Sequence, residues 1–293
     1  MKMMNAPGLE QTRNLLSGYS LEMTVKDMES LRDTASAIEA GTVIGITFLP
    51  GESFEARSAA ARVARELGFE PMPHFAARRL PSQSVFEDFL RALVNEASVR
   101  QCFVIAGDPS QPEGPFGDSA ALIASGVFEK SGITTLGVGG HPEGFAHLDE
   151  AQCWSVLEAK CADISQRGIE PLIVTQFGFN AAAFLDWTRR LRSRGIDAPV
   201  RLGVPGPAGI KTLMRFAARC GVSASTSVMA KYGLSVTRLM GTAGPDRFVD
   251  ALADGLAPGL GKVSLHFYPF GGLGRTVDWI NDYVGRNTTA QLR

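Results

Sequence analysis

The chain has 293 residues, of which 45% are hydrophobic and 20% are charged, with a formal net charge of −1. Such a composition is typical of a globular protein that buries a sizeable core. The balanced charge and the absence of any Lys/Arg-rich block predict no nucleic-acid partner and no association with an anionic membrane.

Neither the N-terminus nor the cysteines indicate an oxidising compartment or a metal site. The first residues, MKMMNAPGLEQTRNLL, lack the apolar stretch and the small-residue cleavage site of a secretory signal, and no later stretch is apolar for long enough to cross a membrane. We therefore expect a cytoplasmic protein. No bound metal is expected either, because no C-x-x-C pair and no His at metal-binding spacing accompany Cys102, Cys153, Cys161 and Cys220.

Short β-like runs alternate with segments of helical period, and this alternation recurs eight times. The run QCFVIAG at Gln101–Gly107 has no period-two alternation, which is typical of a strand covered on both faces in a parallel sheet. The predicted strands are Tyr19–Thr24, Val43–Leu49, Pro71–Ala76, Gln101–Gly107, Thr134–Val138, Pro171–Phe177, Pro199–Val204 and Lys262–Tyr268.

Amphipathic helices are predicted between these strands. Ser53–Leu67 opens with a Ser that can cap its N-terminus, and it closes before Gly68. Ser84–Asn95 and Ala181–Arg194 place their large apolar residues on one face, and the second of them also stops at a Gly, Gly195. We expect these apolar faces to cover the sheet and not to bind a cofactor.

Eight strand–helix units in a chain of this length predict a single-domain (β/α)₈ barrel, with a doubly wound open sheet as the alternative. We assign residues 18–293 to the barrel and residues 1–17 to an N-terminal extension. The long interval between Val204 and Lys262 is expected to hold two or three helical segments that elaborate the seventh unit.

Several predicted strands end in polar residues that a barrel gathers at one rim. Barrels of this kind bind ligands at the carboxyl ends of their strands, and a buried polar side chain there needs a partner because unpaired burial is costly. A purely structural polar network is the alternative, in which Asp108 caps the next helix or ends a turn. The rim residues are Glu22, Thr47, His74, Asp108, the loop Gly139–Gly140–His141, Gln176, Gly203 and Tyr268.

Two Gly-rich loops follow the seventh and eighth predicted strands: GVPGPAG from Gly203 and FGGLGR from Phe270. Barrels often bind phosphate through backbone amides at this position, although glycines there also serve as plain turns. Neither loop matches a Rossmann or a Walker motif, so a dinucleotide held in the Rossmann manner is not predicted.

Seven short motifs follow one another along the chain: SLE at Ser20–Glu22, ITF at Ile46–Phe48, PH at Pro73–His74, GD at Gly107–Asp108, HPE at His141–Glu143, TQF at Thr175–Phe177 and HFY at His266–Tyr268. Their order and spacing resemble those of methylenetetrahydrofolate reductase. The similarity extends from about residue 18 to residue 285 and depends on all seven motifs being in register, because none is specific alone.

The resemblance implies a barrel that holds FAD at its carboxyl rim and uses NADH or NADPH to interconvert 5,10-methylenetetrahydrofolate and 5-methyltetrahydrofolate. It also implies a homo-oligomer and a place in one-carbon metabolism and methionine synthesis. By the same resemblance, Glu22 is the general acid and Asp108 lies beside flavin and folate, so both are predicted catalytic residues. The predicted substrate-binding residues are Glu22, Gln176 and Tyr268, and the predicted cofactor-binding residues are Thr47, His74, Ile105, Ala106, Gly107, Asp108 and His141.

The sequence departs from the family pattern where the cofactor is expected. The family's L-R-G-D reads Ile105–Asp108 here, so Ala106 replaces the arginine that helps to hold FAD. Glycines replace the tyrosine expected before H-P-E, and Asp118 replaces the tyrosine expected after the G-D loop. The expected basic pair falls at residues 162–166, with only Arg167 nearby.

These departures leave several alternatives open. FAD is held through Arg78, Arg79 or Lys160, or the enzyme is a flavin-independent reductase that passes hydride directly from nicotinamide to folate. A catalytically inactive folate-binding barrel is a third possibility. The Gly-rich loops leave a phosphate-binding aldolase-like or isomerase-like barrel as a fourth, although no predicted strand end offers a good lysine for a Schiff base.

Overall fold

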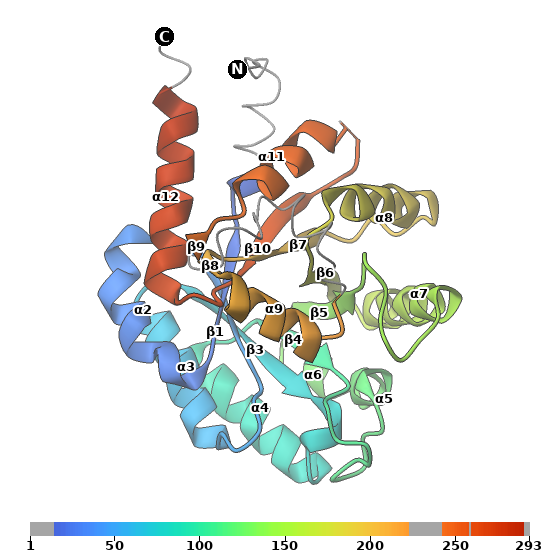
Figure 1. Cartoon of the computed structure of the whole chain (residues 1–293). Coiled ribbons are helices and arrows are strands. Elements are labelled where there is room, and N and C mark those ends of the chain that lie inside the picture. The colour runs from blue at the N-terminus through green and yellow to red at the C-terminus, as the bar shows by residue number, and fades with distance from the viewer. Residues whose placement is uncertain (1–14, 223–241, 258, 290–293) are drawn as a thin grey trace.

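Eight parallel strands close into a barrel at the centre of a single domain, which confirms the predicted fold class. The computed structural model describes residues 15–222, 242–257 and 259–289. Around the ring the strands follow the order β1-β10-β7-β6-β5-β4-β3-β2 (Figure 1). Their bounds are β1 Ser20–Met23, β2 Val43–Ile46, β3 Glu70–Ala76, β4 Gln101–Ile105, β5 Thr135–Gly140, β6 Glu170–Phe177, β7 Val200–Pro205 and β10 Val263–Tyr268.

Every predicted strand overlaps an observed one, and three of the strand ends differ from the predicted ones by two or three residues for reasons of hydrogen bonding. β2 stops at Ile46, and the carbonyl of Leu49 accepts a hydrogen bond from Arg57 instead of joining the ladder. β4 stops at Ile105 because the next carbonyl, that of Ala106, accepts from the Arg78 amide outside the ladder. β5 continues through Gly140, which we had placed in a loop, because Gly139 and Gly140 pair with β6.

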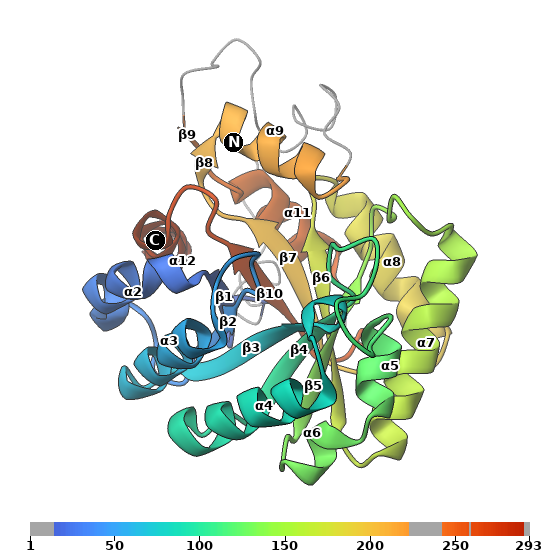
Figure 2. The ribbon, with the colours of Figure 1, turned by 90° about the horizontal axis from the view of Figure 1, so that it is seen from below.

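Helices surround the barrel on its outside (Figure 2). They are α2 Met28–Thr34, α3 Phe54–Glu66, α4 Gln83–Ala97, α5 Ser119–Ala124, α6 Val127–Lys130, α7 Glu150–Gln166, α8 Ala181–Ser193, α9 Ile210–Arg219, α11 Asp246–Gly255 and α12 Leu273–Thr289. Short 3₁₀ turns lie at η1 Val25–Asp27, η2 Ala35–Ala37 and η3 Ala77–Arg79.

Capping residues set the ends of the predicted helices. The Ser53 hydroxyl accepts a hydrogen bond from the Ala56 amide at 3.1 Å, as expected of an N-cap. Ser82 caps α4 by accepting from Val85 at 3.2 Å, so this helix begins before the predicted Ser84. Gly68 follows α3 with a φ of 86°, a conformation that favours glycine.

The long connection between β7 and β10 contains α9 and α11, in line with the predicted helical segments, although residues 223–241 of it lie outside the described part of the chain. It also contains an antiparallel pair of two-residue strands, β8 Ala208–Gly209 and β9 Thr242–Ala243, that we did not predict. Strands this short carry no readable hydrophobic period.

The core has two parts. Large side chains such as Phe75, Phe86 and Phe184 fill the layer between the strands and helices, and each such fully buried side chain contributes roughly 1.5–3 kcal/mol. A small apolar cluster fills the inside of the barrel: Val43, Met72, Phe103, Leu172 and Val174.

The N-terminal segment joins the main core before β1 begins. Leu15 and Leu16, which we assigned to the N-terminal extension, are buried in the layer between the strands and helices. The predicted division at residue 18 stays a prediction.

The two Gly-rich loops pack against each other and their surroundings. A Cβ on Gly271 would lie 2.0 Å from the Pro207 carbonyl oxygen, and a Cβ on Gly206 would lie 2.4 Å from the Thr276 hydroxyl. The Gly206 amide also donates to the Tyr268 carbonyl at 2.8 Å. Close backbone packing therefore accounts for these two glycines without a phosphate ligand.

Two searches of the described residues give negative results. No described helix combines the length and the apolar character that crossing a bilayer requires. Within the same part of the chain, no group of three or more His, Cys, Asp and Glu side chains is arranged to hold a metal ion.

Candidate active site

Glu22, near the end of β1, lies between two histidines from neighbouring strands. Its Oε2 atom is 3.5 Å from Nε2 of His266 on β10 and 4.0 Å from Nε2 of His74 on β3. Gly45 on β2 pairs with Glu22 and leaves room for both rings, because a Cβ there would lie 3.2 Å from His74 and 3.4 Å from His266. The barrel thus brings together two predicted site residues, Glu22 and His74, and adds His266.

Burial controls the protonation of this cluster. It raises the pKa of Glu22 to about 7, with a smaller opposing effect from His74. It lowers the pKa of His74 to about 4 and that of His266 to about 3. Both rings are therefore neutral near pH 7, whereas Glu22 exchanges its proton in that range.

Ser20 fixes the orientation of His266. Its hydroxyl lies 2.8 Å from Nδ1 of His266, and both residues are fully buried. Nε2 of His266 is buried and has no hydrogen-bond partner within the described chain. Because the hydroxyl can donate or accept, His266 can present either N–H or a lone pair to Glu22. The ring is therefore compatible with both protonation states of Glu22.

We expect the protein to lose stability as the pH falls from about 6.5 towards 4. The folded-state pKa values of His74, His266 and His141 are lowered to about 4, 3 and 4, so the unfolded chain binds protons that the folded chain cannot. Glu22 acts in the opposite sense, because its raised pKa gives stability below about 4.5 that is lost as the pH rises through about 7. The three histidines together change the free energy of unfolding more over this pH range than Glu22 does, so the net effect is a loss of stability.

Urea unfolding at about pH 5 and pH 7 checks this expectation. His266→Asn is expected to reduce the stability difference between the two pH values by roughly 1–2 kcal/mol. The matched change at exposed His147, His147→Asn, should leave the difference as it is in the parent. An unchanged difference in His266→Asn would show that His266 is not held neutral by burial.

Tyr268 and Gln176 lie on neighbouring parts of the same rim. The Tyr268 hydroxyl donates to the Thr175 carbonyl at 2.9 Å, and burial, followed by the charge of Glu22, raises its pKa well above the usual value. The Gln176 carbonyl oxygen accepts from the Phe177 amide at 3.1 Å, and no described residue binds its NH₂ group. Tyr268 and Gln176 are two of the three residues that we predicted to bind the substrate, and whether they do so stays a prediction.

An aromatic wall borders this part of the rim. Phe270 stacks on Phe216 of α9 with ring centroids 4.1 Å apart, and on Tyr268 at 5.8 Å. Phe177 meets the edge of Phe270 at 4.7 Å. Sequence reasoning missed Phe216 and Phe270, because stacking between α9 and the loop after β10 has no local signature.

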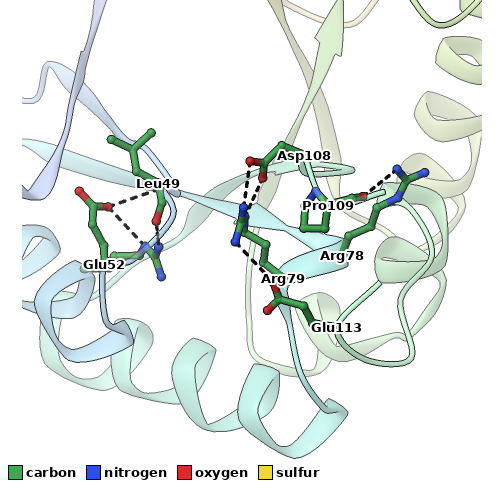
Figure 3. A network of polar contacts seen from close by, with 8 residues as sticks. Leu49, Glu52, Arg78, Arg79, Asp108, Pro109 and Glu113 are labelled. Carbon is green, nitrogen blue, oxygen red and sulfur yellow. Dashed lines mark hydrogen bonds and ion pairs between the residues drawn. The ribbon is translucent and has the colours of Figure 1, made fainter. Parts of the chain in front are cut away.

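Asp108 at the end of β4 forms a two-pronged ion pair with Arg79 of η3 (Figure 3). The two contacts are 2.7 and 2.9 Å long, and this hydrogen bonding holds the pKa of Asp108 below its usual range. Arg79 also contacts Glu113 at 3.4 Å. The Asp108 side chain is 65% exposed and lies at an open part of the rim, and the next helix, α5, is capped by Asp118 instead.

Two of the three cations proposed to hold FAD are engaged with the protein. Arg79 binds Asp108 and Glu113, and Arg78 donates to the Pro109 carbonyl at 3.2 Å (Figure 3). Arg78 also donates to the Gly117 carbonyl at 2.7 Å. Lys160 on α7 is half-buried and forms no ion pair with any described residue. Burial lowers the pKa of Lys160, and Asp118 partly offsets this.

Thr47 follows β2 and has a buried hydroxyl without a partner in the described chain. The loop that carries it is held by Arg57, which is 3% exposed and lies 3.5 Å above the Phe48 ring. Arg57 also donates to the Leu49 carbonyl at 2.5 Å. Burial lowers the pKa of Arg57 to about 10. The position of Arg57 in an Ala-rich helix did not indicate that its side chain would be buried.

His141 follows β5 beside a pocket of about 470 Å³ between α7 and α8. Its ring packs on Phe145 at 4.6 Å, and burial, with a contribution from Lys160, lowers its pKa to about 4. Glu143 of the same motif accepts hydrogen bonds from the amides of Phe179 and Asn180, both at 2.8 Å. Glu143 therefore joins two rim loops.

The structure distributes the remaining predicted cofactor residues along the end of β4 and the turn that follows it. Ile105 is the last residue of the strand, and Ala106 and Gly107 lead into the turn before Asp108. Glu22 and Asp108 belong to strands separated by β2 and β3, so the two predicted catalytic residues lie at different parts of one rim.

A closed parallel barrel with polar side chains gathered at its carboxyl rim is the architecture of (β/α)₈-barrel enzymes, whose active sites lie at that rim. Among solved structures, the fold is similar to that of dihydropteroate synthase from Thermus thermophilus, with a TM-score of 0.51 and 13% sequence identity, covering 91% of this chain and 94% of that one. Residues 19–270 match the family model for methylenetetrahydrofolate reductase, and the chain belongs to this family. The resemblance seen in the seven motifs is confirmed, and the protein is an oxidoreductase that acts on a folate.

Proposed function

We propose that the protein reduces 5,10-methylenetetrahydrofolate to 5-methyltetrahydrofolate with NAD(P)H through bound FAD. The observation that carries this proposal is the placement of Glu22 at the rim, with its carboxyl between Nε2 of His266 at 3.5 Å and Nε2 of His74 at 4.0 Å, where burial raises its pKa to about 7. A glutamate of ordinary pKa is ionised at neutral pH, whereas this one keeps a proton that it can donate. A barrel that only bound folate would have no use for such an acid.

The role of Glu22 is to open the methylene bridge. Its proton goes to the amine nitrogen that leaves the bridge as the carbon–nitrogen bond breaks, and the bridge carbon becomes an iminium. A hydride then reduces that carbon to the methyl group, so NAD(P)H and one proton are consumed for each methyl group formed. His266, tied by Ser20, holds the Glu22 carboxyl on one side.

Gln176 and Tyr268 are the residues that we propose orient the folate. The NH₂ group of Gln176, which no described residue binds, suits an acceptor on the pterin ring. Tyr268 is fixed by its hydrogen bond to Thr175 and presents its ring beside Phe270. Together they confine the substrate next to Glu22 and exclude water from it.

The residues present fit FAD at the positions that the family suggests. The buried hydroxyl of Thr47 has no partner in the described chain and needs a polar one, and Lys160 is a cation without an ion pair in the same part of the chain. We propose that Thr47, Asp108, His141 and Lys160 hold the cofactor. When bound, FAD accepts hydride from the nicotinamide and delivers it to the folate.

Lys160→Met is expected to weaken FAD binding by roughly 10- to 150-fold, because a charge-assisted hydrogen bond to a phosphate contributes about 1.5–3 kcal/mol. Quenching of flavin fluorescence on titration measures the affinity without any turnover. Lys130→Met is the control, since Lys130 lies in α6, which precedes β5 and so leads to the opposite end of the barrel. Equal affinities for both variants would remove Lys160 from the cofactor site.

A flavin-independent reductase is the second candidate, and Ala106 favours it. Ala106 supplies no cation, and Arg79 is already paired with Asp108. The two candidates are separated by the absorbance of the purified protein and by the thermal shift that FAD induces. Flavin absorbance or a stabilising shift supports the first. Oxidation of NADH with methylenetetrahydrofolate by a protein that shows neither flavin absorbance nor a thermal shift with FAD supports the flavin-independent reductase.

Several parts of the assignment remain predictions from the sequence. They include the placement of His74, Ile105, Ala106 and Gly107 at the cofactor, the cytoplasmic location and the homo-oligomeric state. The chemistry of Glu22 is the same in either direction of the reaction, so the direction depends on the cellular ratio of the reactants.

A further inference from the structure

The loop between β6 and α8 is held by a side chain from a different loop. Helix α8 begins after Asn180, whose own side chain makes no capping hydrogen bond. The cap comes instead from Glu143 in the loop after β5, whose Oε1 atom accepts from the backbone amides of Phe179 and Asn180, both at 2.8 Å. Helices α3, α4 and α7, by contrast, are each capped by the residue directly before them.

The surroundings of Glu143 fit its carboxyl closely. Burial raises the pKa of Glu143, and the two amide hydrogen bonds partly offset this effect. Gly178 leaves the space that the carboxyl occupies, because a Cβ there would lie 2.5 Å from Oε1 of Glu143. The same Cβ would also lie 2.5 Å from the ring of Phe184, which is fully buried. A side chain at position 178 would therefore have to displace either the carboxyl or a core ring.

The loop that Glu143 holds continues directly into the candidate folate site. The pairing of β6 with β7 shifts register between Val174 and Phe177, so this pairing does not by itself fix the backbone at Gln176. Phe179, whose amide is held in the contact, meets the edge of Phe177 at 6.0 Å, and Phe177 meets the edge of Tyr268 at 5.5 Å. A movement of the loop at Phe179 would therefore reach both residues that we propose orient the folate.

We infer that Glu143 is a positioning residue for folate binding, because by holding the loop before α8 it fixes the direction of the Gln176 side chain. This inference rests on the proposed function, in which Gln176 orients the folate. The contact requires an oxygen that accepts two backbone hydrogen bonds and not a negative charge, since a carboxamide oxygen accepts in the same way. Removing the oxygen should weaken folate binding and leave the chemical step almost as fast.

The test measures kcat and KM for methylenetetrahydrofolate in two variants of Glu143. Glu143→Leu is expected to raise KM about tenfold with kcat within about twofold of the parent value, whereas Glu143→Gln should keep a KM close to that of the parent. Ser82→Ala is the matched control. Ser82 caps α4 by accepting from the Val85 amide at 3.2 Å, so this variant also loses a helix cap but should keep the parent KM.

A double-mutant cycle with Gln176→Leu separates positioning from a general loss of structure. If Glu143 acts through Gln176, Glu143→Leu should raise KM by much less in the Gln176→Leu background than in the parent. Equal effects in both backgrounds, an unchanged KM, or a Glu143→Gln variant as impaired as Glu143→Leu would overturn the inference. Should Glu143→Leu fail to fold, Glu143→Asp takes its place, since it keeps the charge but is one methylene too short to reach both amides.

The inference and the proposed function fail in different ways. If the parent protein turns over no folate, the proposed reaction is wrong, and the same variants are then compared by calorimetry with 5-methyltetrahydrofolate. Weaker binding in Glu143→Leu that is restored in Glu143→Gln supports the positioning role. Equal binding in all variants, or no binding in the parent, overturns it.

Discussion

Glu22→Gln is expected to lower folate turnover at least about 100-fold, because positioned acid catalysis is typically worth about 10² to 10⁴ in rate. The amide keeps the size of the carboxyl and can still contact His266, but it has no proton to give. The change also removes a buried acid whose ionisation near pH 7 is unfavourable, so the variant should be at least as stable as the parent above that pH.

Two controls make this result specific to the folate step. Nicotinamide oxidation by an artificial quinone acceptor should stay near the parent rate, since it does not need a proton from Glu22. Glu158→Gln, on the exposed surface of α7 where Glu158 pairs with Arg194, should leave both activities unchanged. If Glu22→Gln loses both activities with its melting temperature unchanged, Glu22 belongs to the cofactor site and not to the acid step.

Gly203→Ala is expected to destabilise the protein by about 3 kcal/mol, the upper end of what overpacking a close contact costs. A Cβ on Gly203 of β7 would lie 2.6 Å from the Thr175 carbonyl oxygen and 2.7 Å from that of Gln176. Both neighbours are backbone atoms of β6, at the point where the pairing between β6 and β7 shifts register. The strands must therefore separate, since backbone atoms cannot swing aside like a side chain.

The same change should reach the substrate site, because Tyr268 donates to the displaced Thr175 carbonyl. We expect the melting temperature to fall by roughly 5–10 °C and the KM for the folate to rise in the fraction that stays folded. Gly117→Ala is the matched control, since a Cβ there meets nothing within 4 Å. A parent-like melting temperature for Gly203→Ala would mean that β6 and β7 tolerate a wider spacing than the barrel shows.

The barrel was predictable because its signal is local and repeated. Each buried strand, such as the run at Gln101–Gly107, reads as an apolar segment, and each helix carries its own cap, such as Ser53. The strand ends then follow from the topology, which is how Glu22 and His74 could be placed at one rim before their 4.0 Å contact was known.

The remaining features depend on contacts that no local pattern encodes. Asp108 meets Arg79 across 29 residues, and Ser20 meets His266 across 246. The sequence could nonetheless have indicated His266 as a site residue. It lies two residues before Tyr268, on the same face of the strand, and it opens the HFY motif. The Gly-rich loops pointed to phosphate binding, whereas Gly206 and Gly271 are explained by close packing.

The most direct test of the central claim is an anaerobic reaction of the purified protein with NAD(P)H and 5,10-methylenetetrahydrofolate, in which both the oxidised nicotinamide and the 5-methyltetrahydrofolate formed are measured. We expect equal amounts of the two products from the parent protein. We also expect almost no methyl product from Glu22→Gln, while that variant still oxidises nicotinamide with the quinone. Nicotinamide oxidation without methyl product in the parent, or methyl product from Glu22→Gln at the parent rate, would contradict the proposed function.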